Sequence, residues 1–446
     1  MNLPAAKTDG VILCADIGTS SLKAALVDTD GKLAAFSRKA YAGAAPGGWL
    51  AAFFGALESI ASQCPVRADA VVISGNGPTL VPVLADGASA APLCWFSAPE
   101  NGKGGSGLGR LSGFGGFSDG SSLFLSSVLA LKNRDPETFK KTKLFLSSQE
   151  WLSFSLGADP VTVLPQETYK PFYWDEEQCR KAGLDGKIFP PFAAMGSVIG
   201  TVRNSVPEGC RAVLPDGTPI LAGGPDFIMA LLGSAVVEPG MICDRAGSSE
   251  GINLCIDKAA FDRVSRSAAG AGIRFLPHAR KGFFNAGVII GESGSLFEKY
   301  RRDSGQADKP YDVLMREIAA GGSHPARAVL DRMAFQVTAA LEKLRGAGLA
   351  HGSVQMVVSG GQAKSPLWNA IKAKKTGAVL LVPEIPDGEL AGDAVLGALY
   401  LEAAGGRPVA DGRTAAGGNP PGVFPDPERL REHARRLVRI KERYDP

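Results

Sequence analysis

Two short turns, each a glycine followed by two hydroxyl residues, carry the clearest chemical signal in the sequence. The first is Gly18-Thr19-Ser20 and the second is Gly247-Ser248-Ser249. A turn of this composition can aim several backbone N–H groups at one point, where Ser and Thr hydroxyls add further donors, so it can bind an oxyanion. We expect both turns to hold phosphate groups. For either turn taken alone, an ordinary β-hairpin remains the alternative.

Charged residues beside the first turn suggest a metal-assisted phosphate site. Asp16 lies two residues before Gly18, and a carboxylate there can hold Mg²⁺ through water, because Mg²⁺ prefers oxygen ligands and retains several waters. Lys23 is placed to reach a phosphate from the returning strand. Arg245 stands at the equivalent position before the second turn, so we do not expect the two turns to share one role.

Asp226 is a candidate general base. It lies in the segment GGPDFIMA, between a predicted strand and an apolar helix. Gly223 and Gly224 would leave room for a ligand to approach closely. In phosphoryl transfer an Asp can accept the proton of the acceptor hydroxyl. The alternative is a helix N-cap, a position that Asp favours.

A third glycine site, Gly360-Gly361, follows a buried strand and precedes a helix that begins near Ser365. A strand end, two glycines and a helix N-terminus suit close contact with a nucleotide, although an ordinary turn is the alternative. No GxxxxGK[ST] segment is present, so a P-loop is excluded by pattern. The segment at 102–107, GKGGSG, matches GxGxxG but lacks a strand-to-helix context, and we predict a loop there.

The elements that must position these residues form an α/β pattern with an antiparallel start. Asp30-Gly31 predicts a hairpin, and a break at 238–240 separates two halves, for which we predict domains at 10–235 and 238–440. The expected strands are 11–17, 22–28, 32–41, 70–74, 219–223, 241–246, 251–256, 283–290 and 354–359. The expected helices are 49–63, 122–132, 136–141, 295–302, 311–319, 325–345, 388–404 and an amphipathic helix over 429–439.

An internal repeat links the halves. The segment CADIGTSSLKAALVD, Cys14 to Asp28, aligns without a gap with CDRAGSSEGINLCID, Cys243 to Asp257. In each copy an apolar strand runs into a Gly-hydroxyl-hydroxyl turn and back into a strand. Matches of this length also arise by chance in a glycine-rich chain, but one copy in each half favours two similar lobes over a solenoid of short repeats.

Composition excludes several classes of protein. Lys plus Arg number 48 and Asp plus Glu 45, so the net charge is +3 and a nucleic-acid or membrane-surface role gains little support. No apolar run reaches the ~18 residues of a membrane span, and the N-terminus lacks a signal-peptide core. Seven scattered cysteines without a CxxC pair fit reduced thiols and a cytoplasmic location. Four separated histidines make a zinc site or a histidine-based hydrolase unlikely.

In this order, the segments resemble the FGGY family of carbohydrate kinases, within the actin/Hsp70/sugar-kinase superfamily. The matching segments are DIGTSSLKAALVD (Asp16–Asp28), GGPD with AGSSEGINL (Ala246–Leu254), VVSGGQAKSPLWNAIKAKKTG (Val357–Gly377) and ELAGDAVLGAL (Glu389–Leu399). The resemblance implies an α/β fold of two ribonuclease-H-like, actin-like lobes with a cleft between them. It also implies ATP and Mg²⁺ as cofactors, bound mainly by the second lobe, and a sugar or polyol bound mainly by the first.

The resemblance also implies roles for single residues. Asp226 becomes the catalytic base and a substrate contact, Asp16 assists Mg²⁺ and phosphate geometry, and Asn76 contacts the sugar. The residues expected at the nucleotide and its phosphates are Gly18, Thr19, Ser20, Lys23, Gly247, Ser248, Ser249, Gly360, Gly361, Ser365 and Asn369.

The chain departs from the family pattern mainly around the expected sugar pocket. Many relatives carry an Asp and an Arg after the position of Trp95, where this chain has Phe96-Ser97-Ala98-Pro99. A Lys and a Trp expected near Ser127 and Leu131 are absent, and the chain between 294 and 322 is shortened. We therefore predict an ATP-dependent sugar or polyol kinase. A weakened sugar or nucleotide sensor and a chaperone-like or actin-like ATPase are the alternatives.

The expected partner is a small-molecule sugar or polyol, without nucleic acid or membrane. The sequence leaves open a homodimer.

Overall fold

The computed structural model describes residues 10–94, 122–203, 206–247, 250–267, 270, 272–405 and 424–446, which fall into two compact units. The first unit holds the described residues up to 233 together with 389–405 and 424–437. The second holds the described residues of 234–388 and 438–446. The segment 389–437, which lies inside the predicted range 238–440, thus groups with the first unit. The ranges 10–235 and 238–440 themselves remain predictions.

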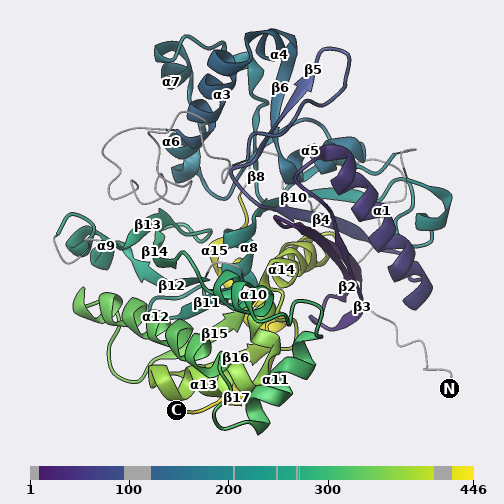
Figure 1. Ribbon diagram of the computed structural model, residues 1–446. Coiled ribbons are helices and arrows are strands. Elements are labelled where there is room, and N and C mark those ends of the chain that lie inside the picture. The colour runs from purple at the N-terminus through teal and green to yellow at the C-terminus, as the bar shows by residue number, and fades with distance from the viewer. Residues whose placement is uncertain are drawn as a thin grey trace. The chain divides into compact units, whose positions relative to one another are not determined.

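A six-stranded sheet forms the centre of the first unit, in the order β3-β2-β1-β4-β10-β9 (Figure 1). Strands β1, β2 and β3 are antiparallel neighbours, whereas β1, β4 and β10 run parallel. Helix α1 packs on β2 and β3 through Trp49, Phe53 and Leu57, which recur at helical spacing and are fully buried. The bounds are β1 Val11–Ile17, β2 Ser21–Asp28, β3 Leu33–Ala40, β4 Ala70–Gly75, β9 Val198–Thr201, β10 Pro219–Pro225 and α1 Pro46–Gln63.

The rest of the first unit consists of short elements and two two-stranded sheets. Figure 1 shows α3, α4, α6 and α7 gathered around β5 and β6. The strands are β5 Leu80–Leu84, β6 Thr142–Ser147, β7 Thr162–Leu164 and β8 Phe192–Ala194. The helices are α3 Leu123–Arg134, α4 Pro136–Lys141, α5 Ser148–Ser155, α6 Lys170–Tyr173, α7 Glu176–Lys181, α8 Asp226–Gly233, α14 Gly388–Ala403 and α15 Pro427–Leu437.

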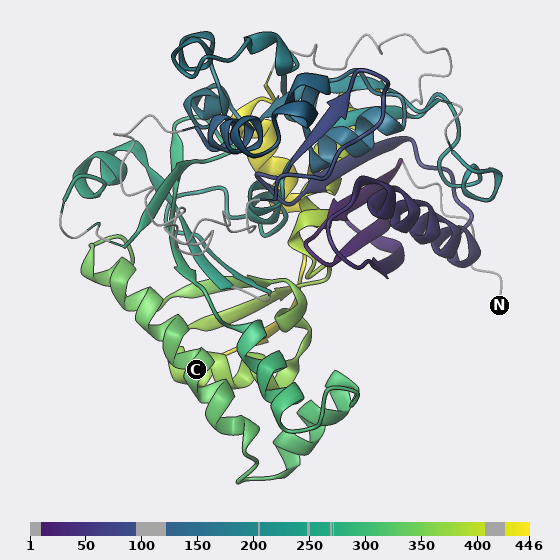
Figure 2. The ribbon, with the colours of Figure 1, turned by 45° about the horizontal axis from the view of Figure 1, so that its top comes forward.

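The second unit is built on a seven-stranded sheet in the order β13-β14-β12-β11-β15-β16-β17. The long helix α12 packs against β12 and β14 (Figure 2). The strands are β11 Ile242–Ala246, β12 Glu250–Asp257, β13 Arg274–Pro277, β14 Phe283–Ile290, β15 Gln355–Ser359, β16 Val379–Pro383 and β17 Ile440–Tyr444. The helices are α9 Lys258–Val264, α10 Gly294–Asp303, α11 Tyr311–Ala320, α12 Ala326–Gly346 and α13 Pro366–Thr376.

The two sheets share one topology, which confirms the expected pair of ribonuclease-H-like lobes. The order β3-β2-β1-β4-β10 in the first unit corresponds to β14-β12-β11-β15-β16 in the second. In both, three antiparallel strands are followed by two parallel ones. The internal repeat therefore reflects equivalent strand pairs, β1–β2 and β11–β12.

Most of the sequence-predicted elements are present, with bounds shifted by a few residues. The predicted terminal helix at 429–439 is α15, which ends at Leu437, and the chain then adds the edge strand β17 to the second sheet. The elements that were not predicted are strands β5, β6, β7, β8, β9, β13, β16 and β17 and helices α5, α6, α7 and α9.

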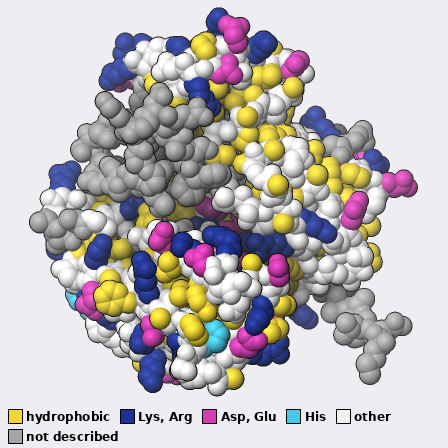
Figure 3. Space-filling model, in the orientation of Figure 1, with side chains coloured by type: hydrophobic (Ala, Val, Ile, Leu, Met, Phe, Trp, Pro, Cys, Tyr) yellow, Lys and Arg dark blue, Asp and Glu magenta, His cyan; other side chains and the backbone are white. Residues whose placement is uncertain are grey.

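Three further features concern membrane spans, cysteines and surface charge. No helix among the described residues is long and apolar enough to cross a membrane. The seven cysteines, all within the described residues, are thiols that form no disulfide. On the face shown in Figure 3, Lys and Arg side chains are mixed with Asp and Glu side chains. The loop prediction at 102–107 and the departure at 96–99 lie outside the described residues.

Candidate active site

Three predicted residues of the first unit follow the carboxyl ends of neighbouring parallel strands. The sheet register pairs Ile17 of β1 with Gly75 of β4, and Gly75 with Pro225 of β10. The residues that come next along the chain are Gly18, Asn76 and Asp226. In sheets of this kind ligands bind outside the carboxyl ends of the strands. The fold therefore brings the first glycine turn, the candidate sugar contact and the candidate base to one edge of the sheet.

Asn76 is held by its backbone, which leaves its side chain for other contacts. Its N–H donates to the Ile17 carbonyl at 2.8 Å, and its own carbonyl accepts from Ser148 Oγ at 3.1 Å. The residue is 3% exposed, and its Oδ1 has no hydrogen-bond partner among the described residues. A buried amide oxygen without a partner is costly, so a ligand hydroxyl would complete this environment.

Asp226 begins helix α8 and is half-buried. The Phe227 N–H donates to its Oδ1 at 2.6 Å, which fixes one carboxylate oxygen at the start of the helix. The position is thus compatible with both predicted roles, a helix-end acceptor and a base.

Packing explains why glycine occurs at the two positions before Asp226, which is not the reason we expected. A Cβ on Gly223 would lie 1.9 Å from the Ile73 carbonyl oxygen, and one on Gly224 would lie 2.9 Å from Met195 Sδ. These glycines let β10 pack against β4 and against a methionine side chain. The expectation that they clear space for a ligand is therefore wrong.

Asp16 lies in a group of charged side chains from β1, β2 and α14. Asp16 and Lys23 are paired directly across the β1–β2 hairpin. Lys23 Nζ lies 3.5 Å from Asp16 Oδ2 and 3.6 Å from Glu389 Oε2. The Lys23 side chain keeps 18% of its surface exposed, whereas the two carboxylates are nearly buried. The lysine therefore partly neutralises the acids and still reaches solvent.

A second acid on α14, Asp393, extends this group. Its Oδ2 accepts a hydrogen bond from Ser74 Oγ at 3.0 Å. Burial, followed by the charge of Asp16, raises the pKa of Asp393 well above its usual range. Sequence reasoning missed Glu389 and Asp393 here, because it grouped their segment with the adenosine side. The available signal was two acids four residues apart in a helix of otherwise small and apolar residues.

Tyr41 supports the first Gly-hydroxyl turn through two hydrogen bonds. The Tyr41 hydroxyl donates to the Gly18 carbonyl, and the Tyr41 N–H donates to the Ser20 carbonyl at 3.0 Å. Burial, followed by Asp16, raises the pKa of the Tyr41 hydroxyl, which keeps it a donor. Thr19 and Ser20 are exposed, so their hydroxyls are accessible to a ligand.

The carboxylate of Asp16 is suited to bind a metal ion through water molecules. Among the described residues, no group of three or more His, Cys, Asp or Glu side chains is arranged to hold a metal ion. One carboxylate acting through water needs no such group, since Mg²⁺ in phosphate sites commonly uses one or two carboxylates, several waters and the phosphates themselves. Asp16 therefore fits the role of an indirect Mg²⁺ ligand.

The second unit brings its two glycine turns together in the same way. Strands β11 and β15 are parallel, with Arg245 opposite Ser359, so Gly247 and Gly360 follow adjacent strand ends. Gly360 has φ +89°, and a Cβ there would lie 2.4 Å from the Ala246 carbonyl oxygen, so only glycine suits this site. Ser248 and Ser249, the expected phosphate contacts, lie outside the described residues.

The remaining predicted nucleotide residues support the turn that follows β15. Gly361 begins a short 3₁₀ helix, Gly361–Lys364. Ser365 caps α13, with its Oγ accepting from the Trp368 N–H at 3.3 Å. Asn369 is 1% exposed and donates from Nδ2 to the Ala363 carbonyl at 2.8 Å. Ser365 and Asn369 thus have structural contacts in addition to any ligand role.

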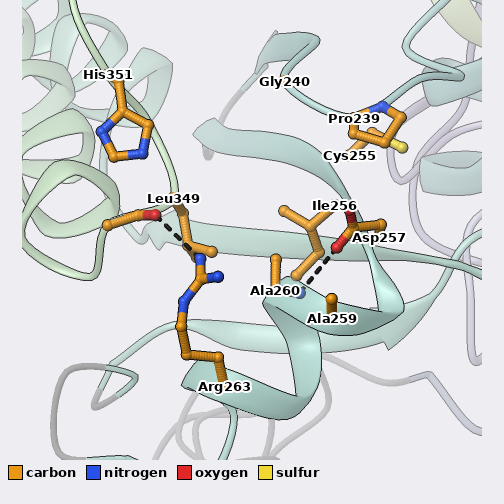
Figure 4. Close-up of a pocket in the computed structure, with 11 residues that line it drawn as sticks. Pro239, Gly240, Cys255, Ile256, Asp257, Ala259, Ala260, Arg263, Leu349 and His351 are labelled. Carbon is orange, nitrogen blue, oxygen red and sulfur yellow. Dashed lines mark hydrogen bonds between the residues drawn. The ribbon is translucent and has the colours of Figure 1, made fainter.

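A cavity of about 220 Å³ in the second unit contains none of the predicted site residues (Figure 4). It lies by Asp257, at the far end of β12 from Gly247. Asp257 Oδ1 accepts from the Ala260 N–H at 2.8 Å, and Arg263 donates to the Gly348 carbonyl at 3.3 Å (Figure 4). Its charged side chains thus already have partners within the unit.

Comparison with known proteins supports the family resemblance. No protein-family model matches the chain. A xylulose kinase of Bacillus subtilis (strain 168) is 25% identical over 86% of this chain and 87% of its own length. An L-fuculokinase of Salmonella typhi is 24% identical over 87% of this chain and 92% of its own.

Solved structures share the fold. The gluconate kinase of Lactobacillus acidophilus superposes with a TM-score of 0.70 at 16% identity, covering 98% of this chain and 93% of its own. The glycerol kinase of Plasmodium falciparum, solved with ADP, gives a TM-score of 0.68 at 15% identity, with coverages of 98% and 94%. Together with the ordered motifs and the duplicated sheet, these findings show that the chain shares the fold of sugar kinases and is similar in sequence to FGGY-family carbohydrate kinases.

Proposed function

We propose that the protein transfers the γ-phosphoryl group of ATP to a hydroxyl group of a sugar, ketose or polyol, with Asp226 as the general base. The observation that carries this proposal is the shared sheet edge at which Gly18, Asn76 and Asp226 follow β1, β4 and β10. An oxyanion-binding turn, an unpartnered amide oxygen and a carboxylate at one edge are what phosphoryl acceptance by an alcohol requires.

In the proposed reaction Asp226 takes the proton of the acceptor hydroxyl. The substrate oxygen then forms a bond to the γ-phosphorus, while the bond between that phosphorus and the ADP oxygen breaks. The Phe227 N–H, 2.6 Å from Asp226 Oδ1, holds the carboxylate in orientation as it gains the proton. In this chemistry the protein mainly positions the reactants and compensates charge.

The phosphates are assigned to the glycine turns. In the first unit, Gly18, Thr19, Ser20 and Lys23 would bind phosphate oxygens, with Asp16 holding Mg²⁺ through water. In the second unit, the Gly247 turn with Ser248 and Ser249 and the Gly360-Gly361 turn would bind the nucleotide, with Ser365 and Asn369 near the adenine side. When bound, Mg²⁺ neutralises phosphate charge.

The substrate is proposed only as a class. Relatives are named for xylulose and L-fuculose, but this chain lacks the Asp and Arg expected after Trp95. A site built around one hydroxyl pattern rejects analogues that leave its polar groups unpaired. We therefore predict that D-xylulose is not the best substrate.

A substrate panel tests the proposal. Pentuloses, hexuloses, polyols and aldonates are offered with MgATP, and ADP release is measured for each. One compound should give turnover that depends on Asp226. Binding of a sugar or of MgATP without any turnover would instead support the sensor alternative, and D-xylulose as the substrate with the highest kcat/KM would contradict the specificity prediction. Location in the cytoplasm and a homodimer remain predictions.

A further inference from the structure

A buried ion cluster lies beside the strand residues that flank the second Gly-hydroxyl turn. Lys372 of α13 is 1% exposed, and its Nζ lies 2.5 Å from Asp244 Oδ2 and 2.6 Å from Glu250 Oε1. Both carboxyl side chains are completely buried. The same Nζ lies 5.1 Å from the centre of the Trp368 ring, a favourable cation–π distance. Helix α13 is thus tied to both strands of the β11–β12 hairpin.

The cluster keeps its lysine charged. Burial on its own lowers the pKa of Lys372, but Asp244 and Glu250 more than reverse this, so the net pKa is raised. Burial and then the neighbouring Glu250 raise the pKa of Asp244 well above its usual range. Burial works to raise the pKa of Glu250 too, but Lys372 outweighs it and the net pKa is lowered. The charges of the lysine and the two acids therefore compensate one another inside the unit.

Hydrogen bonds lead from this cluster to the turn. Glu250 Oε2 accepts from Ser293 Oγ at 2.6 Å. Ser293 Oγ in turn accepts from Gln362 Nε2 at 3.0 Å, and the same Nε2 donates to the Gly247 carbonyl at 2.8 Å. Gln362 belongs to the turn that follows β15. Both glycine turns of the second unit are therefore joined to Lys372 through one continuous chain of contacts.

These contacts hold Gly247 and Glu250 in place. Gly247 and Glu250 are the residues on either side of Ser248 and Ser249. The Gly247 carbonyl accepts from Gln362 and also from the Gly294 N–H at 3.2 Å, and Glu250 is held by Lys372. Fixed ends lower the entropic cost of holding ligand-binding groups in one geometry.

We propose that Lys372, Asp244 and Glu250 are positioning residues for nucleotide binding, which hold Gly247 and the turn that follows β15 in the arrangement that receives the nucleotide. This inference rests on the proposed function. A purely structural role makes a different prediction, because replacing a whole buried ion cluster by apolar residues of similar volume is often neutral or stabilising. Such a replacement separates positioning from stability.

The test is a triple variant, Asp244→Val, Glu250→Leu and Lys372→Met, titrated with MgADP by calorimetry. We expect a melting temperature close to that of the wild type and a Kd for MgADP at least tenfold higher. The matched control is Lys375→Met on the same helix. Lys375 pairs with Asp331 at 3.2 Å, and both side chains are about half exposed. The control should bind MgADP as the wild type does.

A second variant guards against a triple variant that does not fold. Ser293→Ala removes the hydroxyl that joins Glu250 to Gln362 without leaving an unpaired lysine, and we expect the Kd for MgADP to rise about threefold or more in a protein that still folds. Wild-type affinity in the folded triple variant, or in Ser293→Ala, overturns the positioning role alone. Absence of MgADP binding to the wild-type protein overturns the proposed function, and this inference with it.

Discussion

The hairpins β1–β2 and β11–β12 each have a lysine between two carboxylates beside a glycine turn, but the two lysines differ in origin and exposure. In the first unit the lysine comes from the hairpin itself. Lys23 is 18% exposed, and its Nζ lies 3.5 and 3.6 Å from its carboxylate partners. In the second unit the lysine comes from a helix. Lys372 is 1% exposed, with distances of 2.5 and 2.6 Å. The first arrangement is open to a ligand, whereas the second is closed.

The hairpins also differ in register, although their sequences align without a gap. Ile17 pairs with Leu22 in the first, which leaves four residues between them. Ala246 pairs with Glu250 in the second, which leaves three. Because side chains alternate between the faces of a strand, a shift of one residue exchanges the faces. The aligned positions of the second strand therefore cannot be assumed to share a role.

This difference predicts that substitutions in the two units will have different effects. Substitutions at the open edge of the first unit should change turnover or sugar affinity while stability is retained. Substitutions at the closed turns of the second unit should change stability and nucleotide affinity together.

The largest effect is expected for Asp226→Asn. The amide keeps the shape of the side chain and can still accept from the Phe227 N–H, but it cannot take the acceptor proton. General base catalysis contributes roughly 10²–10⁴-fold, so kcat should fall by about that factor. Steady-state kinetics with the best substrate of the panel measures this, and calorimetry should give an unchanged Kd for MgADP.

The control for this variant is Asp175→Asn in the same unit. Asp175 caps α7, with its Oδ1 accepting from the Gln178 N–H at 2.7 Å, and Asn caps helices about as well as Asp. Its kinetics and melting temperature should match those of the wild type. Near wild-type turnover in a folded Asp226→Asn protein would reduce Asp226 to a helix-end residue and require another base.

The second effect concerns the backbone of the closed unit. Gly360 has φ +89° and ψ −173°, a region that only glycine adopts readily, and a Cβ there would lie 2.4 Å from the Ala246 carbonyl oxygen. Gly360→Ala should lower the free energy of unfolding by about 1–3 kcal/mol and weaken MgADP binding. Gly361→Ala is the control, since its Cβ would meet no described atom within 4 Å. Equal stability of the two variants would contradict the assigned strain.

The third effect is a pH dependence carried by His278 in the second unit. Its Nε2 donates to the Val236 carbonyl at 2.8 Å, and its Nδ1 accepts from the Arg280 N–H at 3.0 Å, so the neutral ring is fully bonded. Burial lowers the pKa of His278 to about 4, from 6.5. Between about pH 4 and pH 6.5, His278 therefore binds a proton in the unfolded chain but not in the folded chain. Stability is therefore complete above about pH 6.5 and falls as the pH falls.

Urea unfolding at pH 7.5 and pH 5 measures this contribution. The shift corresponds to about 2 kcal/mol less stability at pH 5. His278→Gln should lose that part of the pH dependence, whereas His351→Gln, at an exposed position, should keep it. An identical pH dependence in wild type and His278→Gln would show that His278 does not carry the effect.

The fold was predictable where burial and pattern coincide. Strands at the centre of the first sheet, such as β1 and β4, are buried and mostly apolar, and a run of this kind identifies a buried strand without tertiary information. Strand β17, with the sequence IKERY, is half-exposed at a sheet edge, so its pattern carries no such signal. The candidate residues Gly18, Asn76 and Asp226 were found because each follows a predicted strand.

The buried ion cluster could not be predicted in the same way. Lys372 lies in a helix that also carries the exposed Lys374 and Lys375, and a lysine in such a helix is ordinarily solvated. Only the tertiary fold, in which Lys372 meets Asp244 of β11 and Glu250 of β12, places it inside. One signal was present, since Asp244 interrupts a short strand that is otherwise buried and mostly apolar, and a buried acid requires a partner.

The smallest effect should separate sugar recognition from catalysis at the open edge. Asn76→Ala removes the buried amide, while the backbone bonds to Ile17 and Ser148 remain. Because Asn76 Oδ1 has no hydrogen-bond partner among the described residues, its removal breaks no hydrogen bond of that oxygen within the described part of the chain and should leave the melting temperature unchanged. Loss of one hydrogen bond to a substrate hydroxyl costs about 0.5–1.5 kcal/mol. We therefore expect the KM for the sugar to rise by up to about tenfold, with the KM for MgATP unchanged.

Thr19→Ala, on the exposed turn of the same edge, is the matched control and should change the KM for MgATP more than that for the sugar. If Asn76→Ala instead lowered the melting temperature and left both KM values unchanged, Asn76 would belong to the packing of the first unit, and the open edge would bind its sugar through other residues.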